Sequence, residues 1–480
     1  MKFISSIYVR SLVGLYIFLL IIQTSGCQKF VEIPLPVNAI AGNAAFTTDK
    51  STAAVLNNIY GTMAGSTTSG FFSSTNGVGF STGLYSDEIV PVITSSIAFA
   101  PFYTDLIDPN GGTSGIWTNF YKQVYNANTV IEGVNSSTTL VYKNQWLGEA
   151  LFLRAWCYFY LTNLFGDVPL ALTTDYTINN TLSRSPQAIV YQQIITDLKQ
   201  AQTLLTDDFK NYNGVTTIDR GRPNKGAATA LLARVYLYTH DWANAENAAT
   251  SLINNTSAYS LVPLSQVFLA NSKETIWSIT LPSTVLEQDY LYYNNNNPTG
   301  NLTNISTLIS AVLSPSLINA FEPGDNRTAN WTRIITSTST PGVKYYLMTK
   351  YKSAVFNAEN VMLMRFAEQY LIRAEARAQL GNILNAQIDL NVVRARAGLA
   401  ATTANSQVAL LAAILKERQT ELFSEVGHRF FDLRRTGNLD AVMTAVAPSK
   451  NAAWAGFKQF WPIPNAEKLS NPNLQQNPGY

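Results

Sequence analysis

The centre of the chain carries the sequence GEALFLRAWCYFYL at residues 148–161. Apolar side chains fill almost every position, so a helix formed here leaves no polar face for solvent. The helical pattern extends over residues 145–165, and Gly166 followed by Pro169 ends it. The stretch therefore predicts a central helix that is buried on all sides.

Two helical hairpins are expected after this helix. The first joins residues 225–239 to 243–253, and the second joins residues 361–380 to 385–397 through Gly381-Asn382. Each second helix repeats small or apolar residues four positions apart, namely Ala245 with Ala249 and Ala386 with Leu390. Such pairs let two helices approach closely, as in tetratricopeptide hairpins. The hairpins are far apart in the chain, so a regular tandem array is not expected.

Further helices are predicted at residues 48–60, 117–130 and 188–205, and from 407 to 427 or beyond. Between them, residues 65–115 and 280–345 are rich in Ser, Thr, Asn, Gly and aromatic residues. Long irregular segments in a compact protein are commonly functional. The expected fold is mainly α, a scaffold of tetratricopeptide-like hairpins that carries long irregular loops.

The composition excludes some classes of protein. The 480 residues are 46% hydrophobic and 13% charged, which is enough apolar material for a large core. The formal net charge is +2, and Lys2 and Arg10 are the charged residues of the first 26 positions. Without that segment the chain is neutral, which argues against nucleic acid as a partner.

The amino terminus resembles the signal of a bacterial lipoprotein. Lys2 and Arg10 precede an apolar run over residues 11–22, which is shorter than the roughly 20 residues that span a bilayer. Thr24-Ser25-Gly26-Cys27 then resembles a lipobox, although the usual leucine three residues before the cysteine is absent. We expect a signal peptide at 1–26, acylation of Cys27, a tether at 27–42 and one helical domain at 43–480, with loop insertions at 65–115 and 280–345. An ordinary cleaved signal with an incidental cysteine is the alternative.

Motifs for catalysis or metal binding are missing from the sequence. The two cysteines, Cys27 and Cys157, exclude a disulfide framework, and Cys157 lies in the apolar central stretch, where a buried side chain is expected. The two histidines are His240, at a helix end, and His428. Metal-binding, nucleotide-binding and nucleophile motifs are not found, so neither a cofactor, a metal nor a catalytic residue is predicted.

A charged signature lies near the carboxyl terminus. Glu417, Glu421 and Glu425 fall on one face of the predicted helix, followed by Arg429 and Asp432. This spacing suits ion pairs between helices. We interpret the signature as a buried structural network rather than as acid–base machinery.

Five blocks of the chain, in order, resemble the RagB/SusD family of surface lipoproteins. They comprise residues 148–161 with 164–170, 221–227 with 231–237, 365–376 with 391–398, 417–435, and 461–464 with 471–480. The resemblance implies a tetratricopeptide-like helical fold and a lipid-anchored position on the outer membrane, exposed at the cell surface. It also implies capture of an oligosaccharide or other nutrient for a TonB-dependent transporter of the SusC type.

Sugar binding requires flat rings for the C–H faces of pyranoses and amides for their hydroxyls. Candidates in the loops are Phe71, Phe72, Phe102, Tyr103, Asn110, Tyr290, Tyr292, Tyr293, Asn294 and Trp331, with Asp87 and Asn295 as polar neighbours. The alternative for each is that it anchors its loop in the core. Core positions are expected for Trp117, Trp146, Trp156, Trp242 and Trp461.

Two other functions stay open at this point. An α-helical glycoside hydrolase could use loop acids such as Asp87, Glu88 and Asp325, although no spacing singles out a pair. A purely structural lipoprotein could stabilise the transporter without touching ligand.

Overall fold

The computed structural model describes residues 42–65, 71–72, 75, 77–294, 301–302, 309–338 and 342–480. Residues 46–480 form one compact unit, and that unit is the subject below. The predicted signal peptide, Cys27 and residues 27–41 of the tether lie outside the described residues, as does Asn295. None of the helices in the described ranges is both long and apolar enough to span a membrane.

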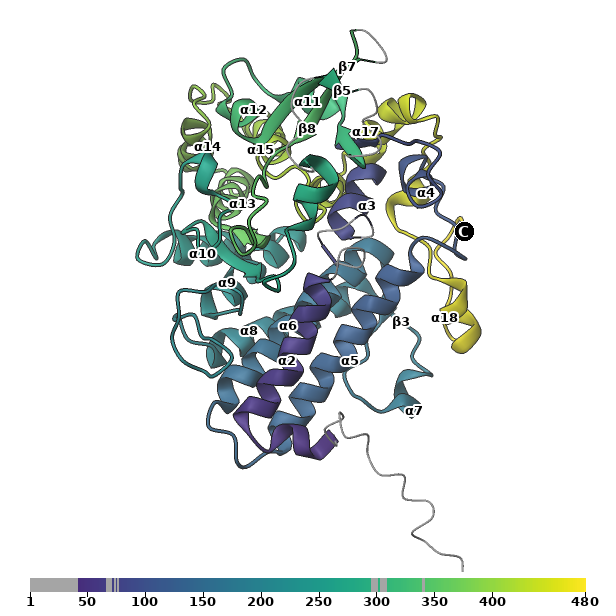
Figure 1. Cartoon of the computed structure of the whole chain (residues 1–480), viewed down its shortest axis with the longest axis vertical. Coiled ribbons are helices and arrows are strands. Elements are labelled where there is room, and N and C mark those ends of the chain that lie inside the picture. The colour runs from purple at the N-terminus through teal and green to yellow at the C-terminus, as the bar shows by residue number, and fades with distance from the viewer. Residues whose placement is uncertain are drawn as a thin grey trace, which may run out of the picture. The chain divides into compact units, whose positions relative to one another are not determined.

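The central helix is α6 (Lys143–Phe165), and every residue from Gln145 to Phe165 is buried. Helices α2 (Asp49–Ala64), α5 (Ser114–Ser136) and α8 (Gln187–Leu204) run beside it (Figure 1). An ion pair between Arg154 of α6 and Asp197 of α8, 2.7 Å apart, satisfies the charges inside this contact. The prediction of a buried central helix is confirmed.

The two hairpins form and pack on each other. The first is α9 (Lys225–Tyr238) with α10 (Trp242–Ile253), and the second is α13 (Phe366–Gln379) with α14 (Ile383–Arg396). Helix α10 lies against α13, and α15 (Gln407–Glu421) packs on the second hairpin. The side chains of Ala245, Ala249, Ala386 and Leu390 are fully buried in these contacts. The mainly α fold with tetratricopeptide-like hairpins is confirmed.

The predicted helix over residues 361–380 was wrong in its first turn. Val361–Arg365 is strand β9, antiparallel to β4 (Thr275–Ile279), and α13 begins only at Phe366. A short apolar run suits a buried strand as well as a helix, and here strand pairing decides. The helix predicted from 407 to 427 or beyond was also too long. Helix α15 ends at Glu421, because left-handed backbone at Ser424, Val426 and Gly427 turns the chain before α16 (His428–Arg435).

The segments predicted to be irregular contain short elements. Residues 65–115 hold α3 (Val78–Tyr85), β1 (Ile89–Pro91) and α4 (Ala100–Tyr103). Residues 280–345 hold the π-helical turn η4 (Tyr290–Asn294), β5 (Asn301–Leu302), β6 (Ala311–Leu313), α11 (Pro315–Ala320), α12 (Asn326–Trp331), β7 (Thr332–Ser337) and the start of β8 (Lys344–Met348). Strand β1 pairs antiparallel with β6, and β7 pairs with β5 and β8. Pairing between β1 and β6 therefore brings the two segments together.

The remaining elements are short and lie at connections or near the carboxyl terminus. They are η2 (Gly42–Phe46), β2 (Val168–Pro169), α7 (Tyr176–Asn179), β3 (Arg184–Ser185), η3 (Leu264–Gln266), α17 (Leu439–Val446), η6 (Ala447–Lys450), η7 (Gly456–Gln459) and α18 (Asn465–Ser470).

Candidate ligand-binding surface

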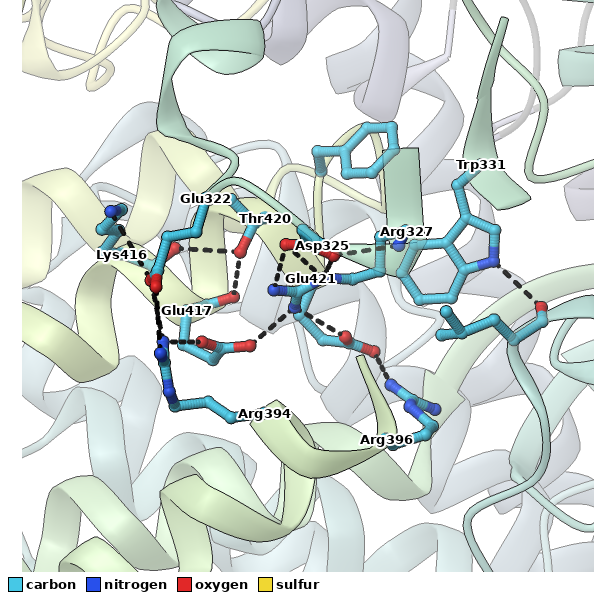
Figure 2. Close-up of polar contacts among 12 residues, drawn as sticks. Glu322, Asp325, Arg327, Trp331, Arg394, Arg396, Lys416, Glu417, Thr420 and Glu421 are labelled. Carbon is cyan, nitrogen blue, oxygen red and sulfur yellow. Dashed lines mark hydrogen bonds and ion pairs between the residues drawn. The ribbon is translucent and has the colours of Figure 1, made fainter. Parts of the chain in front are cut away.

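The charged signature forms a buried ion-pair network (Figure 2). Glu421 of α15 accepts hydrogen bonds from Arg327 of α12 at 3.0 Å, from Arg365 of β9 at 2.5 Å, and from Arg396 of α14. One turn earlier, Glu417 accepts from Arg327 at 2.6 Å. The network therefore fastens four elements that are distant in sequence.

The network extends through Glu425, which accepts from Lys350 at 2.6 Å and from Arg365 at 2.7 Å. Arg429 and Asp432 are not bonded to these glutamates. Arg429 pairs with Asp87, and Asp432 pairs with Arg418 and Arg435. The predicted buried network is thus confirmed for the three glutamates, whereas Arg429 and Asp432 make separate ion pairs.

Electrostatics keep Glu421 charged. Burial favours the neutral acid, but Arg396, Arg365 and Arg327 outweigh that effect and hold the pKa of Glu421 well below its usual range. A carboxylate held ionised by three guanidinium groups is a poor proton donor or acceptor. Its role in this arrangement is structural.

The acids considered for hydrolysis are enclosed as well. Asp87 forms a bidentate pair with Arg429 at 2.8 Å, and Asp325 pairs with Arg327 at 2.7 Å. Glu88 is also buried, and desolvation together with the neighbouring Asp87 raises its pKa to about 8. A glycosidase needs two carboxyl groups that face its substrate across a cleft. These three acids do not meet that requirement here.

A second group of perturbed residues surrounds a very small cavity. Burial raises the pKa of Asp289 to about 8 and lowers the pKa of Lys350 to about 8. The space that both residues line is about 10 Å³, which is no larger than one water molecule needs. No substrate fits there. Among the residues with described positions, no cluster of His, Cys, Asp or Glu is arranged to hold a metal ion.

Most of the predicted ligand-binding residues lie in the core of this structure. The buried ones are Phe71, Phe72, Phe102, Tyr103, Tyr290, Tyr293, Asn294 and Trp331. A ring enclosed on both faces cannot receive a sugar, so in this arrangement these side chains anchor their loops. That was the alternative considered for each of them.

Their neighbours explain the burial. Phe72 packs edge-on against Tyr160 of α6 at 5.0 Å, and Phe71 packs similarly on Phe120 of α5. Trp331 lies beneath Lys350, whose amino group is 4.9 Å from the indole. Phe71 and Phe72 thus anchor their loop on helices α5 and α6.

Further packing fixes the other predicted residues in separate places. Phe102 contacts Trp461 at 5.4 Å, and Tyr103 lies near Lys450. Asn294 accepts from Arg333 and donates to the carbonyl of Tyr351. The ten predicted residues are therefore not gathered into one site.

Two predicted residues stay accessible. Tyr292 is partly exposed, whereas Asn110 is exposed and bonds to Asn465 of the carboxyl-terminal segment. Two further aromatic residues of the same loop segments are partly exposed, Phe99 and Tyr345, and the sequence did not single them out. We name Phe99, Tyr292 and Tyr345 the loop surface.

Contacts of neighbouring residues link the three members of the loop surface indirectly. Phe80 of α3 contacts both Phe99, at 5.1 Å, and Tyr293, which follows Tyr292. The carbonyl of Tyr292 accepts from Ser310 at 2.8 Å, and the adjacent Ile309 belongs to the cluster on which Tyr345 packs. The sequence signal for Tyr345 was the strand-like KYYLM at 344–348, which lay partly outside the predicted loop.

The other sequence predictions for buried residues had mixed outcomes. Trp117, Trp146, Trp156 and Trp461 are core residues, as predicted, but Trp242 is partly exposed and that prediction was wrong. Trp242 is the first residue of α10, directly after the turn of its hairpin, and its ring stacks on the exposed His240. Cys157 is fully buried, and burial raises the pKa of its thiol.

The fold is a scaffold of helical hairpins that carries partly exposed aromatic residues on its loops, and comparison with known proteins shows which family has this fold. A family model described as starch-binding associating with outer membrane, SusD-like, matches residues 49–237, and the SusD family model matches residues 324–480. The chain belongs to the SusD/RagB family.

Similar proteins cover most of the chain. SusD-like protein P2 of Formosa agariphila is 28% identical over 78% of this chain and 82% of its own length. A SusD superfamily structure from Bacteroides vulgatus has a TM-score of 0.75 at 20% identity, over 91% of this chain and all of that one. A structure described as a laminarin binding SusD-like protein has a TM-score of 0.73 at 25% identity, covering 89% of this chain and 99% of that one. The family resemblance predicted from the five blocks is confirmed.

Proposed function

We propose that this protein is a lipid-anchored glycan-binding protein of the outer membrane that delivers oligosaccharide to a SusC-like TonB-dependent transporter. Membership of a family described as starch-binding and outer-membrane-associated carries the proposal. A laminarin-binding relative of similar fold supports glycan as the ligand class. The lipid anchor rests on Cys27 and the lipobox-like sequence before it.

The loop surface is the proposed place of contact. Phe99, Tyr292 and Tyr345 are partly exposed; Phe99 and Tyr345 pack on buried side chains, and the carbonyl of Tyr292 accepts from Ser310. Rings fixed in this way can stack on a pyranose without losing rotamer freedom on binding. Because Asp87 and Asp325 are paired with arginines and Glu88 is buried, binding without cleavage is the function proposed.

Calorimetry with oligosaccharides tests the proposal. Laminarin-derived and other neutral oligosaccharides are titrated into the purified protein, and Tyr292→Ala is expected to weaken binding about fivefold, because one stacking ring contributes on the order of 1 kcal/mol. Tyr212→Ala is the matched control, since Tyr212 is an exposed tyrosine on the connection between α8 and α9.

Three outcomes would contradict the proposal. Absence of binding to every glycan would favour a structural role beside a transporter. Release of reducing ends from the glycan would favour a hydrolase. Equal affinity of the wild type and of Tyr292→Ala for the glycan would show that Tyr292 does not contact it.

A further inference from the structure

A groove of about 740 Å³ opens among helices that do not carry the loop surface. Its walls come from α10, α13, α15, α16 and α17, and α10, α13 and α15 lie beside one another in Figure 1. The volume falls within the range of small-molecule sites. We name it the helical groove.

One end of the helical groove holds an aromatic pair. The imidazole of His240 stacks on the indole of Trp242 with ring centroids 4.9 Å apart and an angle of 16° between the rings. His240 is exposed and Trp242 is partly exposed. Both residues line the groove, and because each ring covers one face of the other, the pair can offer a ligand only its outer face and its edges.

His240 occupies the left-handed position of the turn in its hairpin. His240 has a left-handed backbone with φ +59°, and the next residue, Asp241, donates its N–H to the carbonyl of Tyr236. The second hairpin makes the same turn with Gly381 at φ +79°, and Asn382 donates to the carbonyl of Arg377.

Helices α14 and α16 also end in a left-handed glycine, Gly398 and Gly437. Glycine adopts this conformation freely, whereas a residue with a Cβ is strained in it. The first hairpin thus carries a strained residue where its counterparts use glycine.

The remaining walls of the groove combine apolar and polar groups. Leu411 and Leu415 of α15 provide a partly exposed aliphatic side. Glu375 and Arg435 form an ion pair at 2.5 and 2.8 Å that also lines the groove, beside the amide of Gln379. Fixed polar groups next to an aromatic platform and an apolar wall suit a ring that has both C–H faces and hydroxyls.

We propose that the helical groove is a second oligosaccharide-binding site, in which the stacked His240 and Trp242 form the platform. The inference rests on the proposed glycan-binding function and places a second contact on the helical scaffold. A glycan chain long enough could then be held at the loop surface and at the groove together, which raises its overall affinity.

The histidine content of the chain permits a direct test. The sequence has two histidines, His240 in the groove and His428, which is buried. Protein labelled with ¹³C at histidine therefore gives two imidazole signals, and His240→Gly assigns them. Laminaritetraose, maltotetraose, xylotetraose and mannotetraose are added at millimolar concentration. We expect at least one of them to move the His240 signal and leave that of His428 in place.

Variants separate the groove from the loop surface. Trp242→Ala is expected to raise the half-saturating concentration at His240 about fivefold or more. Tyr292→Ala is expected to leave the His240 titration unchanged while weakening the calorimetric signal. His240→Gly keeps the left-handed turn, which glycine adopts freely, and is expected to bind less glycan because the imidazole is removed.

Each outcome bears on one of the two proposals. Calorimetric binding without movement of the His240 signal overturns the second site and leaves the proposed function standing. Absence of any binding overturns both. A His240 titration unaffected by Trp242→Ala overturns the stacked platform.

Discussion

At the scale of single residues, Glu88 makes the stability of the folded protein depend on pH. Its side chain is buried, and its carboxylate accepts a hydrogen bond from the backbone N–H of Ser424 at 3.2 Å. Desolvation and the charge of Asp87 raise its pKa from 4.5 to about 8. The folded protein therefore keeps a proton on Glu88 over a pH range in which the unfolded chain has released it.

The sign of the pH effect follows from this difference. Below pH 4.5 both states are protonated and the contribution of Glu88 to stability is fully present. As pH rises towards about 8, the free energy of unfolding falls by up to about 1.4 kcal/mol per pH unit. Asp289, whose pKa burial also raises to about 8, acts in the same direction.

We predict that Glu88→Gln reduces this slope without removing it. The amide oxygen of glutamine can still accept from Ser424, and a neutral side chain no longer titrates. Urea denaturation at a series of pH values between about 5 and 8 measures the slope. Asp207→Asn, at an exposed acid, should keep the wild-type slope. A Glu88→Gln curve parallel to wild type would show that Glu88 is ionised in the folded state.

Residue types alone could not place the candidate site. The sequence identified aromatic residues in two segments, but burial depends on what packs above each ring, and that contact comes from distant parts of the chain. Tyr292 and Tyr293 are neighbours, yet one is partly exposed and the other is packed on Phe80. Trp242 is the opposite case, because it was expected in the core and is partly exposed.

At the scale of elements, Glu421 joins α15 to a strand and two other helices. Glu421→Gln keeps the shape of the side chain but leaves Arg327, Arg365 and Arg396 with one charged partner fewer. Removal of one partner from a buried ion pair typically costs about 3–5 kcal/mol. We therefore predict a loss of about 3 kcal/mol or more in the free energy of unfolding, measured by urea denaturation at neutral pH.

Glu322→Gln is the matched control for this prediction. Glu322 pairs with Arg394 and Lys416 at the edge of the same network, but its side chain is 33% exposed (Figure 2). Solvent screens such pairs, and a loss below about 1 kcal/mol is expected. Similar losses in the two variants would mean that the interior of the network is as solvated as its edge.

Helices were predictable where periodicity and end signals agreed, as in α6 with Gly166 behind it and in the two hairpins. Strand β9 was missed because its five apolar residues suit either structure, and the pairing with β4 is a contact between residues about 90 apart. The end of α15 was missed because Ser424 and Val426 adopt left-handed backbone, which neither residue type favours.

At the scale of the whole molecule, order along the chain was the most informative signal. Each of the five blocks is short, but their sequence order matches one family, and two family models cover the regions where most of them lie. The residues that would contact a ligand are less predictable, because the loop surface lacks the regular sequence pattern of the helical scaffold. Its rings come from segments whose short strands and turns have little periodicity, and they are held by packing between those segments.

Membrane attachment is a property of the whole molecule that one residue should control. We predict that wild-type protein, expressed in a bacterium with an outer membrane, fractionates with the membrane and incorporates labelled palmitate, because each buried CH₂ of an acyl chain contributes about 0.8 kcal/mol. Cys27→Ala should release the protein into the soluble fraction without label. Cys157→Ala should behave as wild type, since that thiol is fully buried. Palmitate retained by the Cys27→Ala variant would show that the lipid is attached elsewhere, and soluble wild-type protein would show that the chain is not anchored to the membrane.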